Sequence, residues 1–200
     1  AAIRAEEGST LVDCTAYGNS SGSGFFGYAI AAGKGCTLTN CTARENSSTA
    51  DFGYFIHADA GSTLTNCTSS SNTHTGSLAG YGIRTEAACT LQNCTGSENT
   101  SSAMTSAGIR AGFRGVVIAC TASNNTNTHL TLDYDNGGGI AAEGESMVKD
   151  CTVVWNTGDG IQVSLGAVVI GNTCANNGAV LGDGAGIHCT NGQNRIEDNS

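Results

Sequence analysis

The side chains best suited to chemistry in this sequence occur as acid–base pairs at a regular spacing. His57 and Asp59 form the first pair, Arg84 and Glu86 form the second, and Arg110 follows at the next equivalent position. Such groups can exchange a proton with a substrate, and an arginine can neutralise a carboxylate. Because they lie far apart along the chain, they form one site only if a repeated fold stacks them. The alternative is a ladder of surface ion pairs with no chemical role.

A repeat of variable length, roughly 21–31 residues, runs through the chain and predicts this stacking. In seven units an isoleucine is followed, at fixed offsets, by a Leu or Val, a Cys (Asn in the seventh), a Thr and an Asn. The isoleucine column is Ile3, Ile30, Ile56, Ile83, Ile109, Ile140, Ile161 and Ile187. The asparagine column, whose stacked amides are expected to bond to one another, is Asn19, Asn46, Asn72, Asn99, Asn125, Asn156 and Asn177.

Apolar and polar residues alternate within short segments of each unit, such as Ile-x-Ala and Cys-Thr-Ala. This alternation predicts strands with one buried face, separated by turns that contain Gly or Asn. Three short strands in each unit predict an all-β fold, a right-handed single-stranded parallel β-helix of about seven and a half coils. We expect one domain over residues 1–200, without evident capping elements. Its ends are expected either to continue into further coils of a longer chain or to stack head-to-tail on other copies, forming filaments.

Ten cysteines occur, and six of them occupy the same position in successive units. Stacked side chains with parallel Cα–Cβ bonds are poorly oriented for disulfides, so we expect a ladder of buried free thiols. Bridges within one coil are the alternative for two Cys-x4-Cys pairs. We expect no metal site, because the coils that carry these pairs are two turns apart. The ladder is Cys14, Cys41, Cys67, Cys94, Cys120 and Cys151, and the alternative bridges are Cys36–Cys41 and Cys89–Cys94.

Composition excludes several classes of partner. The net charge is −9 and only 12% of residues are charged, which argues against nucleic acid and against anionic membrane surfaces. No apolar run approaches the ~20 residues that span a bilayer. We also expect no cofactor.

Two further surfaces are candidates for ligand binding. Tyrosines that stand two residues before three of the isoleucines are expected to stack beside the charged residues. The loop from Thr126 to Gly138 is the longest insertion, and it carries groups able to bind a glycan or a cation. Its acidic run is only a fragment of a calcium loop, so we predict no metal there. The candidate ligand-binding residues are Tyr28, Tyr54, Tyr81, His129, Asp133, Tyr134 and Asp135.

Threonine ranks form a third surface. Thr37-Leu38-Thr39 and Thr63-Leu64-Thr65 project paired threonines, flanked by Thr10 and Thr90. Ice-binding solenoids resemble this arrangement, which makes ice binding a weaker alternative. Threonine also suits exposed strand positions as a β-branched residue.

The repeat, Gly-x-Gly-Ile followed by Thr-Leu-x-Asn-Cys-Thr and then Asn, resembles that of the right-handed parallel β-helix proteins. This pectate lyase-like superfamily includes pectate lyases, polygalacturonases, mannuronan epimerases and bacterial surface proteins. The segment 184–200 is most similar to the bacterial surface-type repeats. The resemblance implies an extracellular or cell-surface protein of a bacterium.

Two functions follow from this resemblance. The first is a non-catalytic structural or surface solenoid that binds glycan and stacks into filaments. The alternative is a polysaccharide lyase or epimerase in which His57, Asp59, Arg84, Glu86 and Arg110 act on uronates. The sequence lacks the Gly-His-Gly motif and the three-Asp calcium cluster of such enzymes, and 156–159 (Asn-Thr-Gly-Asp) only mimics their Asn-Thr-Asp motif. The last residue of that segment is expected to serve an ordinary turn. We therefore favour the non-catalytic function.

Overall fold

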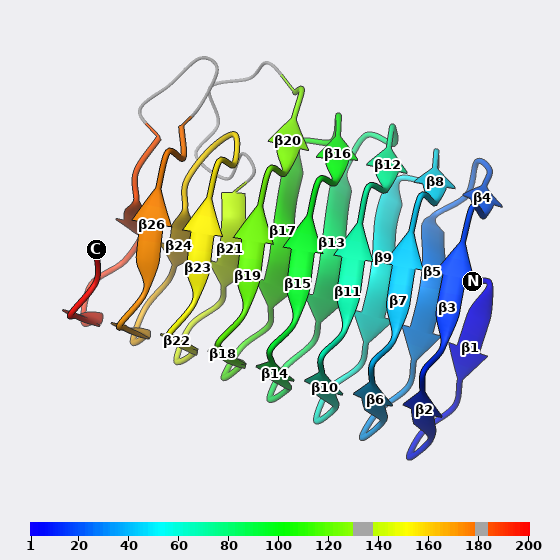
Figure 1. Ribbon diagram of the computed structural model, residues 1–200, viewed down its shortest axis with the longest axis horizontal. Coiled ribbons are helices and arrows are strands. Elements are labelled where there is room, and N and C mark those ends of the chain that lie inside the picture. Colours follow the sequence, from blue (N-terminus) through cyan, green and yellow to red (C-terminus); the bar gives the residue numbers. More distant parts are fainter. Residues whose placement is uncertain (130–137, 179–183) are drawn as a thin grey trace.

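The computed structural model describes residues 1–129, 138–178 and 184–200. In these residues the chain winds into a right-handed solenoid of parallel strands, with no α-helix (Figure 1). The predicted all-β parallel β-helix is therefore confirmed. The described part holds no helix of the length and apolarity needed to cross a membrane.

Two sheets of eight strands run along the solenoid axis. Sheet A contains β1 (Ile3–Ala5), β5 (Phe26–Ala32), β9 (Phe52–Ala58), β13 (Ala79–Thr85), β17 (Thr105–Ala111), β21 (Gly138–Ala142), β24 (Ile161–Val163) and β27 (Ile187–Cys189). Sheet B contains β2 (Thr10–Val12), β6 (Thr37–Thr39), β10 (Thr63–Thr65), β14 (Thr90–Gln92), β18 (Val116–Ile118), β22 (Met147–Lys149), β25 (Val168–Ile170) and β28 (Arg195–Glu197).

Two further sheets complete the coils. Sheet C contains β3 (Thr15–Tyr17), β7 (Thr42–Arg44), β11 (Thr68–Ser70), β15 (Thr95–Ser97), β19 (Thr121–Ser123), β23 (Thr152–Val154) and β26 (Thr173–Ala175). Sheet D contains the very short strands β4 (Ser20–Ser21), β8 (Ser47–Ser48), β12 (Thr73–His74), β16 (Thr100–Ser101) and β20 (Thr126–Asn127). The sequence predicted three strands per coil, and it missed sheet D because strands so short cannot show alternation.

The isoleucines stack in register through all eight strands of sheet A. Ile3 pairs with Ile30, Ile56 pairs with Ile83, and the column continues to Ile187. These side chains and the Leu and Val side chains of sheet B fill a narrow apolar core. The predicted stacking of distant residues is therefore confirmed. Among the described strands, β1 pairs only with β5 and β27 pairs only with β24. Axial stacking or continuation into further coils stays a prediction.

Most corners between sheets use a residue in the left-handed backbone region. The residue before the cysteine column has this conformation, as in Asn40, Asn66 and Asn93, each with φ of 54°. Asn tolerates this region better than most residues because its short side chain bonds locally. A second left-handed corner precedes the asparagine column, and a third lies between sheets A and B. These corners turn the chain abruptly and keep the coil compact.

The asparagine column forms a continuous hydrogen-bonded ladder inside the coils, as predicted. Asn99 Nδ2 donates to Asn125 Oδ1 at 3.1 Å, and Asn125 Nδ2 donates to Asn156 Oδ1 at 2.8 Å. Each carboxamide oxygen also accepts the backbone N–H of the previous asparagine in the column, and Nδ2 reaches a backbone carbonyl as well. The ladder thus satisfies buried polar groups that an apolar side chain would leave unpaired.

The six cysteines of the predicted ladder are free thiols, and so are the other four, so neither alternative bridge is formed. Within the ladder, Cys94 Sγ lies 3.5 Å from the carbonyl oxygen of Leu64 on the preceding coil, and Cys67 is bonded in the same way. Interaction with the next thiol, together with burial, raises the pKa of Cys94 and Cys120 to about 12. The ladder therefore acts as small buried packing groups.

The asparagine ladder predicts a large stability loss for Asn125→Ala. The change leaves the buried backbone N–H of Asn99 without its acceptor, and it removes one further hydrogen bond each from Asn99 Nδ2, the carbonyl of Gly96 and Asn156 Oδ1. Together these losses cost about 3 kcal/mol. The midpoint of urea unfolding, followed by circular dichroism, measures this loss. Asn124→Gly is the matched control, because Asn124 is exposed and its φ of 55° suits glycine. Equal midpoints for the two variants would contradict a structural role for the ladder.

Thiol chemistry tests the cysteine ladder. At pH 8 a group with a pKa of about 12 is a thiolate in about one molecule in ten thousand. Iodoacetamide should therefore leave Cys94 and Cys120 unmodified in the native protein, while the half-buried Cys14 and Cys189 react. After unfolding without reductant, mass spectrometry should find every cysteine alkylated. A pair of cysteines that reacts only after reduction would reveal a disulfide and refute the free ladder.

Candidate functional site

The predicted acid–base residues lie together on the outer face of sheet A. Strand register places His57 of β9 beside Arg84 of β13, and Arg84 beside Arg110 of β17. Each side chain follows an inward isoleucine and therefore points outward. The expected patch over three coils is present in the structure, and its organisation decides what it can do.

Four of these side chains form a connected chain of polar contacts, which we name the charged cluster (His57, Asp59, Arg84 and Glu86). Glu86 Oε1 lies 3.3 Å from His57 Nε2 and 2.9 Å from Arg84 Nη2. Asp59 Oδ1 lies 4.0 Å from the same His57 nitrogen. The acids therefore face the bases of their own cluster. Arg84 Nε is buried without a hydrogen-bond partner in the described structure, because the guanidinium covers an aromatic ring.

That ring belongs to a stack of three tyrosines, which we name the tyrosine ladder (Tyr28, Tyr54 and Tyr81). Ring centroids are 5.8 Å apart between Tyr28 and Tyr54, and 5.6 Å apart between Tyr54 and Tyr81. The Arg84 guanidinium lies 4.5 Å from the Tyr54 centroid, and the Arg110 guanidinium lies 5.3 Å from that of Tyr81. Tyr54 is only 1% exposed, so cations and neighbouring rings cover most of the ladder.

An interruption of strand alternation puts the ladder on the outer face. Tyr54 and Ile56 are separated by Phe55 alone, so simple alternation would turn the Tyr54 ring into the core. Instead Phe55 and Ile56 are both buried in the core, and the register skips Phe55 between two paired positions. Tyr54 and His57 therefore share the outer side, with ring centroids 5.6 Å apart.

Burial sets the ionisation of this face. It raises the pKa of Tyr54 to about 12 and raises that of Tyr28 as well. Burial also lowers the pKa of His57, although Glu86 and Asp59 oppose the change. Near neutral pH the charged cluster therefore holds a neutral imidazole that donates from Nε2 to Glu86.

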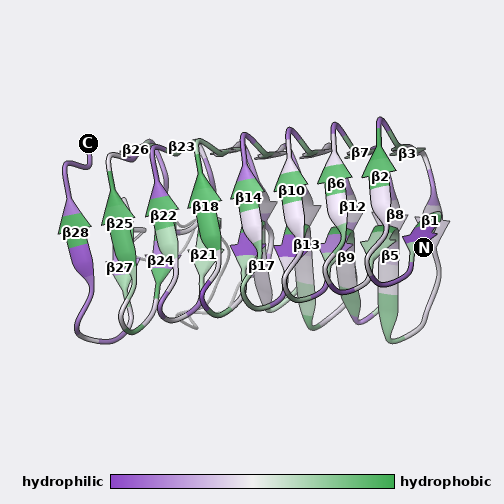
Figure 2. Ribbon diagram, turned by 90° about the horizontal axis from the view of Figure 1, so that it is seen from below, coloured by the Kyte–Doolittle hydropathy of each residue, from purple (hydrophilic) through white to green (hydrophobic). Residues whose placement is uncertain are grey.

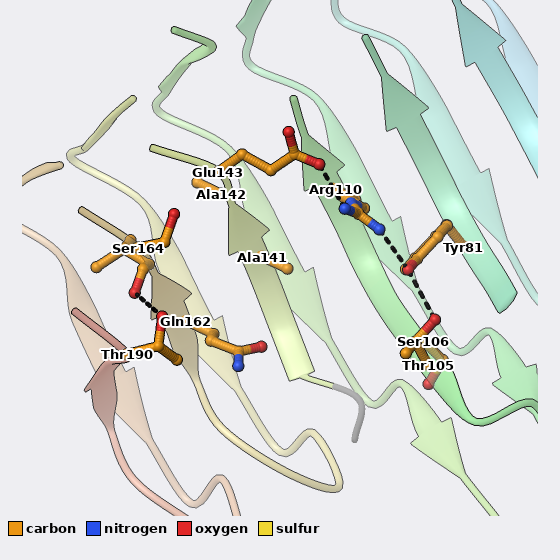
Figure 3. Close-up of a pocket in the computed structure, with 11 residues that line it drawn as sticks. Tyr81, Thr105, Ser106, Arg110, Ala141, Ala142, Glu143, Gln162, Ser164 and Thr190 are labelled. Atoms are coloured by element: carbon orange, nitrogen blue, oxygen red, sulfur yellow. Dashed lines mark hydrogen bonds and ion pairs between the residues drawn. The ribbon is translucent and has the colours of Figure 1, made fainter. Parts of the chain in front are cut away.

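A groove of about 170 Å³ opens where the tyrosine ladder ends (Figure 3). Ala107 takes the position of Tyr81 on the next coil, and Ala141 takes that of Arg110. These small side chains leave a hollow between Tyr81 and Arg110 on one side and Gln162 on the other. The groove is lined by Tyr81, Thr105, Ser106, Arg110, Ala141, Ala142, Glu143, Gln162, Val163, Ser164 and Thr190.

One chain of polar contacts organises the wall of this groove. Arg110 Nη2 forms an ion pair with Glu143, and Nη1 donates to the hydroxyl of Tyr81 at 2.8 Å. The Tyr81 hydroxyl lies 2.9 Å from Thr105 Oγ1. In Figure 3 the Arg110 side chain lies between Glu143 and Tyr81. Arg110 thus belongs to the groove rather than to the charged cluster, with which the sequence grouped it.

The sequence pattern missed several groups on this face. Glu143 and Gln162 were not selected, although both stand in the outward columns of sheet A. The sequence feature that could have indicated them is the change from large to small residues at Ala107 and Ala141, because small side chains there leave the groove open. Aromatic rings also extend beyond the predicted ladder: Phe25, Phe26 and Phe52 pack at centroid distances of 4.6 to 5.4 Å.

Asp159 does more than the ordinary turn expected for it. Its Oδ2 lies 2.7 Å from His188 Nδ1, and its Oδ1 accepts the backbone N–H of Ala185 at 2.8 Å. This carboxylate therefore fixes the turn before β27 as well as the orientation of the His188 ring. The pair tethers two neighbouring coils.

The other predicted ligand residues belong to the loop that follows β20. Asp133, Tyr134 and Asp135 lie outside the described residues. His129 is half-buried, and its backbone N–H donates to Asn127 Oδ1 at 2.8 Å. Within the described ranges, no group of three or more His, Cys, Asp or Glu side chains is placed to hold a metal ion.

The threonine ranks of sheet B stack in register but end early. Thr10, Thr37, Thr63 and Thr90 are aligned over four coils, and Val116 then takes the same position. Figure 2 shows the change, since β18 and β25 are hydrophobic along most of their length whereas β6 and β10 are mixed. This outer face therefore changes its chemistry halfway along the solenoid.

Comparisons with known proteins add little to the site. No family model and no curated protein matches the chain. A solved structure of full-length QnrB1, a plasmid-mediated fluoroquinolone resistance protein, is 11% identical with a TM-score of 0.21, covering 92% of this chain and 93% of that one. Its trypsin-treated variant is 13% identical with a TM-score of 0.20, covering 92% and 91%. So low a TM-score carries no argument.

The class of protein therefore rests on the strand register, which defines a parallel β-solenoid repeat protein. The narrower membership of the pectate lyase-like superfamily, implied by the sequence resemblance, finds no support in these comparisons.

The lowered pKa of His57 predicts acid sensitivity. As pH falls through ~6.5, the unfolded chain binds a proton before the folded chain does, so folding stability decreases until the lowered folded pKa is reached. Urea unfolding at pH 7.5, 6.5 and 5.5 should show a smaller loss for His57→Gln than for the unchanged protein. His74, whose pKa burial also lowers, contributes equally to both proteins. An equal loss in both would contradict a lowered His57 pKa.

Proposed function

We propose that this protein is a non-catalytic, extracellular β-solenoid that binds carbohydrate in the groove on the outer face of sheet A. The groove beside Tyr81 and Arg110 is the observation that carries this proposal. Its volume of about 170 Å³ is below the ~300–1,000 Å³ of pockets that hold drug-sized ligands, and it suits about one sugar ring of a longer chain. It also runs across neighbouring strands, so a chain can extend along the axis.

The chemistry of the lining supports a sugar as the ligand. A guanidinium, a carboxylate, an amide and threonine hydroxyls line the groove. Together they offer donors and acceptors in the mixture that sugar hydroxyls, themselves both donors and acceptors, require. The edge of Tyr81 and the methyl group of Ala141 add apolar surface for the C–H groups of a pyranose.

The charged cluster supports a role without catalysis. A general base needs a proton acceptor that faces the substrate. In this cluster Glu86 faces both His57 and Arg84, while Asp59 faces His57. These pairs tie β9 to β13 and hold Arg84 over Tyr54, which keeps the groove-forming ladder rigid.

Binding should depend on the groove and not on arginine in general. Arg110→Ala removes the contacts to Tyr81 and Glu143, and we expect it to weaken oligosaccharide binding at least about tenfold, about 1.4 kcal/mol, in calorimetric titration. Arg44→Ala is the matched control, because Arg44 also covers a tyrosine, Tyr17, but lies on sheet C. Equal affinities would contradict the proposed site.

The enzymatic alternative would be favoured if the unchanged protein eliminated or epimerised uronates and Arg84→Ala abolished this activity. Polyuronate incubated with the unchanged protein and with this variant decides the question by the appearance of unsaturated or epimerised products. We expect none from either protein.

A further inference from the structure

We propose that the groove selects neutral sugars and rejects uronates. This inference rests on the proposed function and adds the class of ligand. It concerns Glu143, a residue that the sequence did not single out and that the groove places beside Arg110.

Arg110 is the only cationic side chain lining the groove in the described structure, and its charge is already matched. One terminal nitrogen forms an ion pair with Glu143 and the other donates to the Tyr81 hydroxyl. A bound uronate carboxylate would have to displace Glu143 or lie next to it. Because like charges at such short range repel, both arrangements disfavour a uronate.

The neighbouring cation cannot make up for this. Arg84 lies one strand away and donates to Glu86 at 2.9 Å, with its guanidinium stacked on Tyr54. Across the described residues of this face, each arginine near the groove is therefore matched by one carboxylate. A uronate would find no surplus positive charge.

Neutral hydroxyls meet no such penalty. The Arg110 and Glu143 side chains are 29% and 44% exposed, so both remain accessible from the groove. A carboxylate oxygen can accept a further hydrogen bond from a sugar hydroxyl, and a guanidinium has five N–H donors. Gln162 and Thr190 on the opposite side supply an amide and a hydroxyl. The groove thus matches a neutral pyranose that carries hydroxyl groups on both edges.

The test compares two oligosaccharides of equal length that differ at C6 only, an oligoglucoside and an oligoglucuronide. We expect the unchanged protein to bind the neutral chain at least about tenfold more tightly. Glu143→Gln removes the repelling charge and frees Arg110, so it should reduce the preference at least about tenfold or reverse it. Arg110→Gln should weaken uronate binding further, because it leaves the negative charge of Glu143 without its cationic partner.

Glu45→Gln is the matched control, since Glu45 pairs with Arg44 at an exposed corner away from the groove and should change neither affinity. The affinity for the neutral oligoglucoside should also change little between low and high salt, because this ligand carries no net charge. Tighter binding of the glucuronide by the unchanged protein, or an unaltered preference in Glu143→Gln, overturns the inference and leaves carbohydrate binding standing. Failure of both chains to bind, in a folded protein, overturns the proposed function itself.

Discussion

In-register stacking of successive coils is the constraint on which the whole structure depends. Parallel strands lie ~4.8 Å apart, so each side chain has its counterpart from the adjacent coil as its nearest neighbour. Stacked apolar side chains, such as Ile56 over Ile83, stabilise the fold by burying one another. Buried polar side chains are tolerated in such a column only if they form hydrogen bonds with their neighbours along the axis. The asparagine ladder meets this requirement because an amide donates from one end and accepts at the other. It fixes the register as well as satisfying the backbone.

The same register builds the outer face of sheet A. Side chains at equivalent positions of successive coils become neighbours, which turns isolated charges into the charged cluster and three tyrosines into a ladder. A regular array alone would offer a flat surface with no site. The groove arises where the array stops, because Ala107 and Ala141 replace larger side chains while the backbone continues unchanged. The candidate binding site on this scaffold therefore lies at a departure from the repeat.

The proposal of binding without catalysis rests on the charge balance within this face. The cluster acids contact the cluster bases, and Arg110 contacts Glu143 and Tyr81. Such pairs are worth little as exposed ion pairs, but here they cover aromatic rings and connect adjacent coils. The result is a rigid wall with little net charge beside a polar hollow. That combination suits a ligand rich in hydroxyl groups.

The sequence by itself determined the solenoid, its register and its interior, because the columns of Ile, Cys and Asn recur at fixed offsets and stacking follows directly from a shared offset. It also brought His57, Arg84 and Arg110 to one face. Only the tertiary structure decided the rest. The sequence predicted the tyrosine stack beside the charged residues, but not the break in alternation at Phe55 that turns Tyr54 outward. The partner of Arg110 and the groove beside it depend on side chains from several coils. The sizes of these side chains and the distances between them cannot be read from any single repeat.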